Sequence, residues 1–125
     1  MSERGQRDVA RLAAAAASRG ARPELVWHSG KLRARQTAEA FWRACNPLAA
    51  FSAARDLQPD DPPAWILNQI RAENRDVLIA GHMPHLAGLL QLLGADEPFP
   101  LHGIVALECG DAEETWKEIW RLTAE

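Results

Sequence analysis

The sequence predicts an α/β fold, a three-layer sandwich with a mainly parallel sheet between two layers of helices. Short apolar segments typical of strands alternate along the chain with longer segments whose apolar residues recur at helical spacing. The run Val77–Ala80 is apolar at every position and is bounded by Asp76 and Gly81, which is typical of a strand buried on both faces. Strands that alternate with helices pair in parallel, so the two observations together indicate a sandwich.

Four helices are expected, each from apolar residues at three- and four-residue spacing. The first begins after Ser2, a typical N-cap residue, and ends at Gly20. Proline is favoured at the start of a helix and glycine just beyond its end, so Pro84 opens the fourth helix and Gly94 closes it. The expected helices cover residues 3–19, 30–45, 63–73 and 84–93.

Four strands are expected between and after these helices. The apolar segment Leu25–Trp27 predicts the first, and a loop with a short extended piece follows the second helix over residues 46–61. The tail Thr115–Leu122 fits both helical and strand patterns, and its aromatic and β-branched residues favour a strand. The expected strands cover residues 24–28, 77–80, 104–107 and 115–122.

Composition limits the classes of function. With 125 residues the chain is long enough for one domain, residues 1–125, with its own core. A formal net charge of −3 without a Lys/Arg-rich tract argues against a nucleic-acid partner, and no apolar stretch has the length of a membrane span. Cys45 and Cys109 fit reduced cysteines of a cytosolic chain better than a disulfide scaffold. We expect a cytoplasmic, monomeric protein.

Two strand-to-helix junctions carry residues suited to phosphate chemistry. His28–Arg33 follows the first strand, and Gly81–His85 follows the strand at 77–80. If both strands are parallel, both junctions lie at the carboxyl edge of the sheet, where open α/β folds bind their ligands. Arg33 and His82, each near a helix N-terminus, would then form an anion clamp, because free N–H groups and the helix dipole favour negative charge there.

Each of these residues also has a purely structural interpretation. An arginine early in a helix is often solvated or ion-paired, and a single histidine at a strand end is often structural. Ser29 is most simply the N-cap of the second helix, and His28 is expected either at the surface or behind the site. The four histidines and two cysteines do not have the spacing of zinc ligands, so no metal and no cofactor is expected.

Several segments resemble the histidine phosphatase superfamily. The run Ser29–Glu39 (Ser-x-x-x-Arg-Ala-Arg-Gln-Thr-Ala-Glu) is similar to its second signature, and Gly81–Leu86 (Gly-His-x-Pro-His-Leu) is similar to its late histidine motif. Ser2–Gly5 followed by a helix resembles the segment after the family's first loop. The small size, the Gly-Ile-Val-Ala-Leu-Glu strand at 103–108 and the tryptophan-containing tail resemble its phosphohistidine phosphatases of the SixA type.

The resemblance implies a phosphatase in which a histidine attacks the phosphoryl group, forms a phosphohistidine and is freed by water, without a metal. It implies catalytic roles for Arg33 and His82, which would bind phosphoryl oxygens and stabilise charge as the bond breaks. Ser29, Met83 and His85 are expected to contact the substrate. That substrate would be a phosphorylated protein or a small phosphate ester.

The chain departs from the family at its beginning. The family's nucleophile lies in an Arg-His-Gly motif at the end of a first, central strand, whereas this chain begins at Met1, directly before the segment that follows that motif. The resemblance therefore implies N-terminal truncation, with exposed edges on the neighbouring strands. Met1 stands where relatives commonly carry leucine, so we expect an alternative start codon and a longer native protein. Gly30, where the family usually has proline, is expected to loosen its turn.

Two functions follow from the sequence. One is a phosphohistidine phosphatase-like domain, whose turnover requires the missing nucleophile. The other is a non-catalytic phosphate-binding or interaction module of the same fold, because a clamp without a nucleophile binds a phosphoryl group but does not hydrolyse it.

Overall fold

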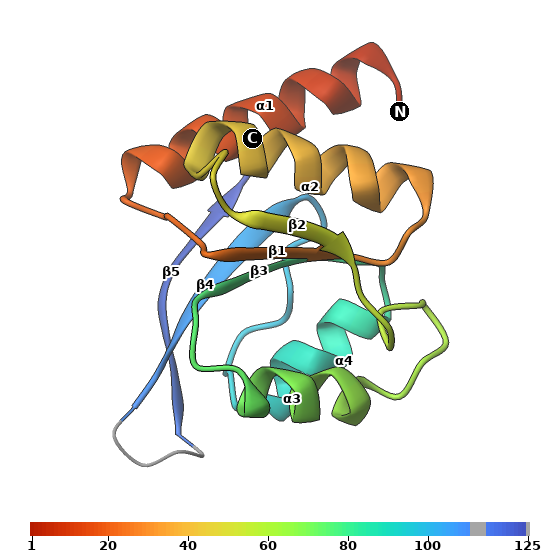
Figure 1. The fold of residues 1–125 in the computed structure, drawn as a ribbon, viewed down its shortest axis with the longest axis vertical. Helices are drawn as coiled ribbons and strands as arrows, with labels where there is room; N and C mark the ends of the chain where they lie inside the picture. The colour runs from red at the N-terminus through yellow and green to blue at the C-terminus, as the bar shows by residue number, and fades with distance from the viewer. Residues whose placement is uncertain (111–114, 125) are drawn as a thin grey trace.

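Helices and strands alternate along the chain in the order that the sequence predicts, and the short extended piece expected within residues 46–61 is a strand. The computed structural model describes residues 1–110 and 115–124. Its elements are α1 (Glu3–Ser18), β1 (Leu25–His28), α2 (Leu32–Cys45), β2 (Ala50–Ala53), α3 (Pro63–Ala72), β3 (Val77–Ala80), α4 (His85–Leu92), β4 (Gly103–Cys109) and β5 (Trp116–Thr123). Figure 1 shows α1 and α2 on one side of the strands and α3 and α4 on the other, so the predicted α/β sandwich is confirmed.

The strand β1 lies at the centre of a parallel sheet with the order β2-β1-β3. His28, the last residue of β1, lies opposite Ala53 of β2 and Ala80 of β3, which are the last residues of their strands. All three strands therefore end at the same edge. The strands β4 and β5 pair antiparallel with each other in a separate sheet.

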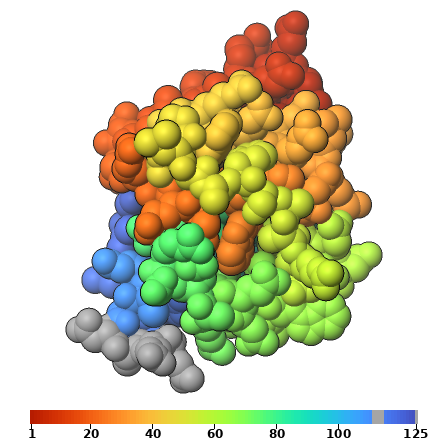
Figure 2. All heavy atoms as spheres, in the orientation of Figure 1, coloured from red at the N-terminus to blue at the C-terminus, as the bar shows by residue number. Residues whose placement is uncertain are grey.

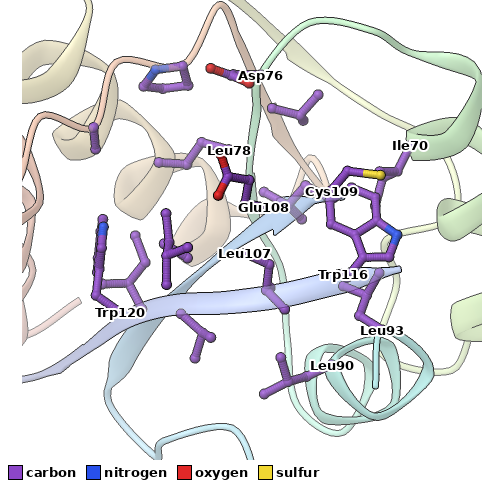
Figure 3. A pocket seen from close by; sticks show the side chains of 18 of the residues that line it. Ile70, Asp76, Leu78, Leu90, Leu93, Leu107, Glu108, Cys109, Trp116 and Trp120 are labelled. Atoms are coloured by element: carbon purple, nitrogen blue, oxygen red, sulfur yellow. The ribbon is translucent and has the colours of Figure 1, made fainter. Parts of the chain in front are cut away.

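A cavity of about 770 Å³ lies between the two sheets. Apolar side chains of β3 and β4 line it, together with Leu90 and Leu93 at the end of α4 and the indoles of Trp116 and Trp120 (Figure 3). Among the described residues, β3 pairs only with β1 and β4 pairs only with β5. Each of these two strands therefore has one edge without a hydrogen-bonded neighbour.

The unpaired edge changes the burial of β3. The sequence predicts a strand buried on both faces, but Val77, Leu78 and Ile79 are only partly buried. The central strand β1, which has a neighbour on each side, is buried at all positions but Trp27. The prediction for β3 is wrong because an apolar run reflects the environment of a strand inside a continuous sheet, and the sheet stops at β3.

The apolar core lies on both sides of the strands. On one side, Leu78 of β3 and Trp120 of β5 pack against a buried cluster on α1 and α2: Leu12, Ala13, Ala16, Phe41 and Cys45. On the other side, Ile79 of β3 and Leu107 of β4 pack against a second cluster: Leu57, Ile66, Leu67, Leu89 and Leu93. Both clusters contact both sheets, so packing against the helices holds β4 and β5 beside β3, and the described strands of the two sheets form no ladder with each other.

Most predicted boundaries agree with the structure to within a few residues, and the tail is a strand as expected. The helix α2, however, begins at Leu32, and its N-cap is Lys31. The N-cap role predicted for Ser29 is therefore wrong, because Gly30 has a φ of 89° and this left-handed conformation cannot continue a helix. In the described parts of the chain, no helix combines the length and apolar character needed to cross a membrane.

The α3–α4 core should depend strongly on Leu57, whose side chain is fully buried at 0% exposure, whereas Leu48 is 86% exposed. Leu57→Ala should lower the free energy of unfolding by about 2–5 kcal/mol, because it removes buried methyl groups and leaves a cavity. Urea denaturation measures this change. The matched variant Leu48→Ala should change stability by less than about 0.5 kcal/mol, and equal losses in both variants would contradict this description of the core.

Candidate active site

The loops that follow β1 and β3 meet at the carboxyl edge of the parallel sheet. Because His28 and Ala80 are register partners at the ends of neighbouring strands, the residues that follow them lie side by side. Ser29 Oγ lies 2.6 Å from His82 Nε2, which is a direct hydrogen bond between the two loops. The prediction that both junctions lie at one edge of the sheet is confirmed.

Hydrogen bonds hold the turn that carries Ser29. The Gly30 N–H donates to His28 Nδ1 at 3.0 Å, and the Lys31 N–H donates to Ser29 Oγ at 3.3 Å. The side-chain amide of Gln58 donates to the Ser29 carbonyl at 2.7 Å. In Figure 2 the segment that contains Gln58, in lime, lies against the start of α2, in orange. Proline cannot adopt the positive φ of Gly30, so the backbone conformation of this turn is one that a proline at this position could not have. The expected loosening of the turn stays a prediction.

The first turn of α2 is rich in positive charge. Lys31, Arg33 and Arg35 are exposed, and none of them has an ion-pair partner in the part of the chain that the structure describes. The turn contains no acidic residue. The free N–H groups and the dipole of this 14-residue helix add to the positive potential, so the loop edge favours an anion.

The two histidines at this edge favour their neutral forms. Burial lowers the pKa of His82, and the charges of Lys31 and His85 lower it further. Burial is also the main reason that the pKa of His28 is lowered, with a contribution from Arg35. A neutral imidazole has one N–H and one nitrogen lone pair, so each ring can donate at one nitrogen and accept at the other.

The remaining predicted residues lie in contrasting environments. Met83 is 44% exposed in the loop after β3, whereas His85 is 1% exposed at the start of α4. Neither ring nitrogen of His85 has a hydrogen-bond partner among the described residues. His28 is 5% exposed, with its ring centroid 5.0 Å from that of Phe51, so a surface position for His28 is wrong. It is buried because β1 has a strand on each side.

Gln58 and Lys31 belong to the site although neither motif predicts a role for them. Gln58 is 29 residues from Ser29 in sequence, and only the fold brings its amide to that carbonyl. Lys31 lies next to the arginine motif, so a count of positive charges at the helix start could have found it. In the described residues, no three side chains of the metal-ligating types His, Cys, Asp and Glu lie together.

Acidification should destabilise the protein through its buried histidines. The pKa values of His28 and His82 are lowered from 6.5 in the folded state, so the unfolded chain binds more protons as the pH falls below that value. Their contribution is therefore complete above about pH 6.5 and is lost on acidification. Urea unfolding at about pH 7.5 and about pH 5.5 measures the difference. His28→Gln should reduce the loss of unfolding free energy on acidification. The control His102→Gln, at an exposed position, should show the same loss as the unmodified protein. A full loss in His28→Gln would show that this buried histidine is not its cause.

No protein-family model and no curated protein matches the sequence, but solved structures do. A candidate phosphohistidine phosphatase SixA from Agrobacterium tumefaciens matches with a TM-score of 0.79 and 26% identity, over 98% of this chain and 81% of that chain. The protein histidine phosphatase SixA in complex with tungstate matches with a TM-score of 0.84 and 19% identity, over 99% of this chain and 83% of that chain. The resemblance drawn from the motifs is confirmed, and the chain has the SixA-type fold of the histidine phosphatase superfamily.

Proposed function

We propose that this chain forms most of a phosphohistidine phosphatase, which hydrolyses phosphoryl groups on protein histidines or small phosphate esters through a phosphohistidine intermediate. The observation that carries the proposal is the hydrogen bond between Ser29 and His82, because it joins the two family motifs in one site. Arg33, which is close to Ser29 in sequence and has no ion-pair partner among the residues that the structure describes, also supports it. The likeness to SixA in complex with tungstate supports it as well, since tungstate is a tetrahedral oxyanion like phosphate.

Arg33 and His82 could assist both steps of such a hydrolysis. In the first, a histidine nitrogen attacks phosphorus, the bond from phosphorus to the leaving group breaks, and the leaving group takes up a proton. In the second, water attacks phosphorus, the P–N bond breaks, and inorganic phosphate leaves while the histidine is regenerated. The guanidinium of Arg33 would bind two phosphoryl oxygens, and an N–H of His82 would donate to the third, so both would stabilise charge in the transition state.

The nucleophile is not evident among the described histidines. His28 Nδ1 accepts from Gly30, His82 Nε2 is hydrogen-bonded to Ser29, and His85 is buried. The fourth histidine, His102, lies directly before β4 in the separate two-stranded sheet. We therefore propose that the nucleophile lies on a further strand, which carries the Arg-His-Gly motif and precedes α1 in a longer native chain.

The cavity between β3 and β4 is the place that we propose for this strand. Both of its walls offer a strand edge that lacks a neighbour among the described residues, and its lining is mainly apolar. A strand parallel to β3 would end at the edge where Ser29 and His82 lie. Figure 1 shows that α1 starts on the side of the molecule at which β1 and β2 end, so such a strand could connect through α1 to β1 as a strand–helix–strand unit.

A phosphorylated protein is the substrate that we favour. Arg33 and Met83 are exposed at the site, so a phosphoryl group on the surface of another protein could reach the clamp. We also propose that the enzyme acts as a monomer in the cytoplasm, in keeping with its two cysteines and its moderate net charge of −3.

A non-catalytic phosphate-binding module is the second candidate for the chain of 125 residues. Two hydrogen bonds favour this alternative: His28 Nδ1 accepts from the Gly30 N–H, and His82 Nε2 is bonded to Ser29 Oγ. Neither of these two nitrogens is free to attack phosphorus in this structure. If residues 1–125 hydrolyse a phosphohistidine peptide and Arg33→Ala abolishes the activity, this binding-only alternative is excluded.

Phosphate binding tests the clamp directly. Calorimetric or NMR titration of residues 1–125 with inorganic phosphate should detect binding, and Arg33→Ala should weaken it about 10- to 100-fold, since a hydrogen bond to a charged group contributes about 1.5–3 kcal/mol. Arg43→Ala is the matched control, because Arg43 lies in the same helix but is paired with Glu39. The same loss in both variants would show a diffuse charge effect and would contradict a clamp at Arg33.

A longer chain tests the additional strand. A protein extended upstream to include the strand and its Arg-His-Gly motif should hydrolyse a phosphohistidine peptide, whereas residues 1–125 should only bind phosphate. It should also melt about 10 °C higher, because burying two apolar side chains in the cavity contributes about 3 kcal/mol or more. A stop codon upstream of Met1 with no in-frame Arg-His-Gly would contradict the proposed strand.

A further inference from the structure

The hydroxyl group of Ser29 has two polar partners. The backbone N–H of Lys31 lies 3.3 Å from Oγ, and Nε2 of His82 lies 2.6 Å from it. A backbone N–H can only donate, so Lys31 occupies one of the two lone pairs of the oxygen. If His82 donated to the other lone pair, the hydroxyl hydrogen would have no acceptor among the described residues. Since Ser29 is only 7% exposed, water competes little for this hydrogen.

The distance between the two side chains indicates which of them donates. Hydrogen bonds from an N–H to an oxygen span about 2.7–3.2 Å, whereas those from an O–H to an oxygen extend down to about 2.5 Å. At 2.6 Å, the contact between Ser29 and His82 is shorter than the usual range for an N–H donor. The geometry therefore favours donation from Ser29 Oγ to a lone pair on Nε2.

We propose that Ser29 is a positioning residue that fixes the tautomer of His82, with the imidazole proton on Nδ1 and the lone pair of Nε2 held by the Ser29 hydroxyl. Both partners are anchored through their backbones. Gln58 donates to the Ser29 carbonyl at 2.7 Å, and the Leu86 N–H donates to the His82 carbonyl at 2.9 Å. The ring is thereby held in one orientation before any ligand binds.

The charges around His82 act in the same direction. Burial is the main reason that the pKa of His82 is lowered, and Lys31 in the turn before α2 and His85 on α4 lower it further. The ring at rest is therefore neutral, and Nδ1 is its one N–H donor. If the chain is a phosphatase as proposed above, Nδ1 is the nitrogen that donates to a phosphoryl oxygen. The tautomer itself does not depend on that function, because it follows from the geometry without a ligand.

Imidazole ¹⁵N chemical shifts test the tautomer without a ligand, because a protonated ring nitrogen and one with a free lone pair have distinct shifts. Residues 1–125 are measured at about pH 7.5, above the ordinary histidine pKa, and His82→Asn identifies the signals of His82. The expected spectrum has the proton on Nδ1 and the lone pair on Nε2. A proton on Nε2 would overturn the proposal.

Variants of Ser29 separate positioning from a purely structural role. Ser29→Ala should abolish the preference for the Nδ1 proton and raise the pKa of His82 by about half to one pH unit, because nothing then stabilises the lone pair. Ser29→Thr keeps a hydroxyl and should restore both properties. Ser52→Ala, on the exposed surface of β2, is the matched control and should change neither. If Ser29→Ala keeps the His82 tautomer and pKa of the unmodified protein, the role of Ser29 is overturned. If Ser29→Ala does not fold, the ¹⁵N spectrum of the unmodified protein still tests the tautomer.

Titration with inorganic phosphate in the same experiment separates this inference from the proposed function. Phosphate should shift the Nδ1 signal of His82 more than the Nε2 signal. If phosphate does not bind, the function fails while the tautomer is still measured. If phosphate binds and the Nε2 signal shifts instead, the function stands and the role assigned to Nδ1 is wrong.

Discussion

The parallel pairing of β1 with β3 is the constraint on which the site depends. It places His28 opposite Ala80, so the loops that follow the two strands begin at neighbouring points of one edge. Ser29 and His82, which are 53 residues apart in sequence, are then close enough for a hydrogen bond. A shift of register by one residue would move one loop along the strand and turn its side chains to the other face, so the site requires this register.

The sheet itself is discontinuous. Among the described residues, the ladder of hydrogen bonds stops at β3, and β4 and β5 are held beside it by packing against helices on both sides. Such packing is not directional, and it leaves a cavity of about 770 Å³ between β3 and β4, which do not pair with each other in the described part of the chain. A cavity of this volume is unusual between packed layers, because protein interiors are close-packed and voids weaken the contacts around them. The same feature explains why β3 is less buried than its sequence predicts.

Electrostatics and hydrogen bonding act together at the loop edge. The exposed cations at the start of α2 favour an anion, and they also disfavour a protonated histidine nearby. Burial and these cations favour the neutral form of His82, in the loop after β3, and the nitrogen from which it donates is the one that carries the proton. The sequence alone predicts that the Ser29 hydroxyl caps a helix, but its hydrogen bond with Nε2 allows it to determine which tautomer His82 adopts. A single turn thus supplies both positive charge and a hydrogen-bonding partner for the histidine.

The sequence by itself determined the fold class and the two strand-to-helix junctions at His28–Arg33 and Gly81–His85, because apolar periodicity and turn residues are local properties of the chain. The alternation of strands and helices, the strand at 77–80 and the helix opened by Pro84 could all be predicted in this way. Only the tertiary structure decided what the junction residues contact. Gln58 binds the Ser29 carbonyl, His28 is buried against Phe51, and β3 faces a cavity, and none of these follows from local pattern. Each depends on which distant segments the sheet brings together, and burial and hydrogen-bond partners are set by those segments and not by the residues' own neighbours in sequence.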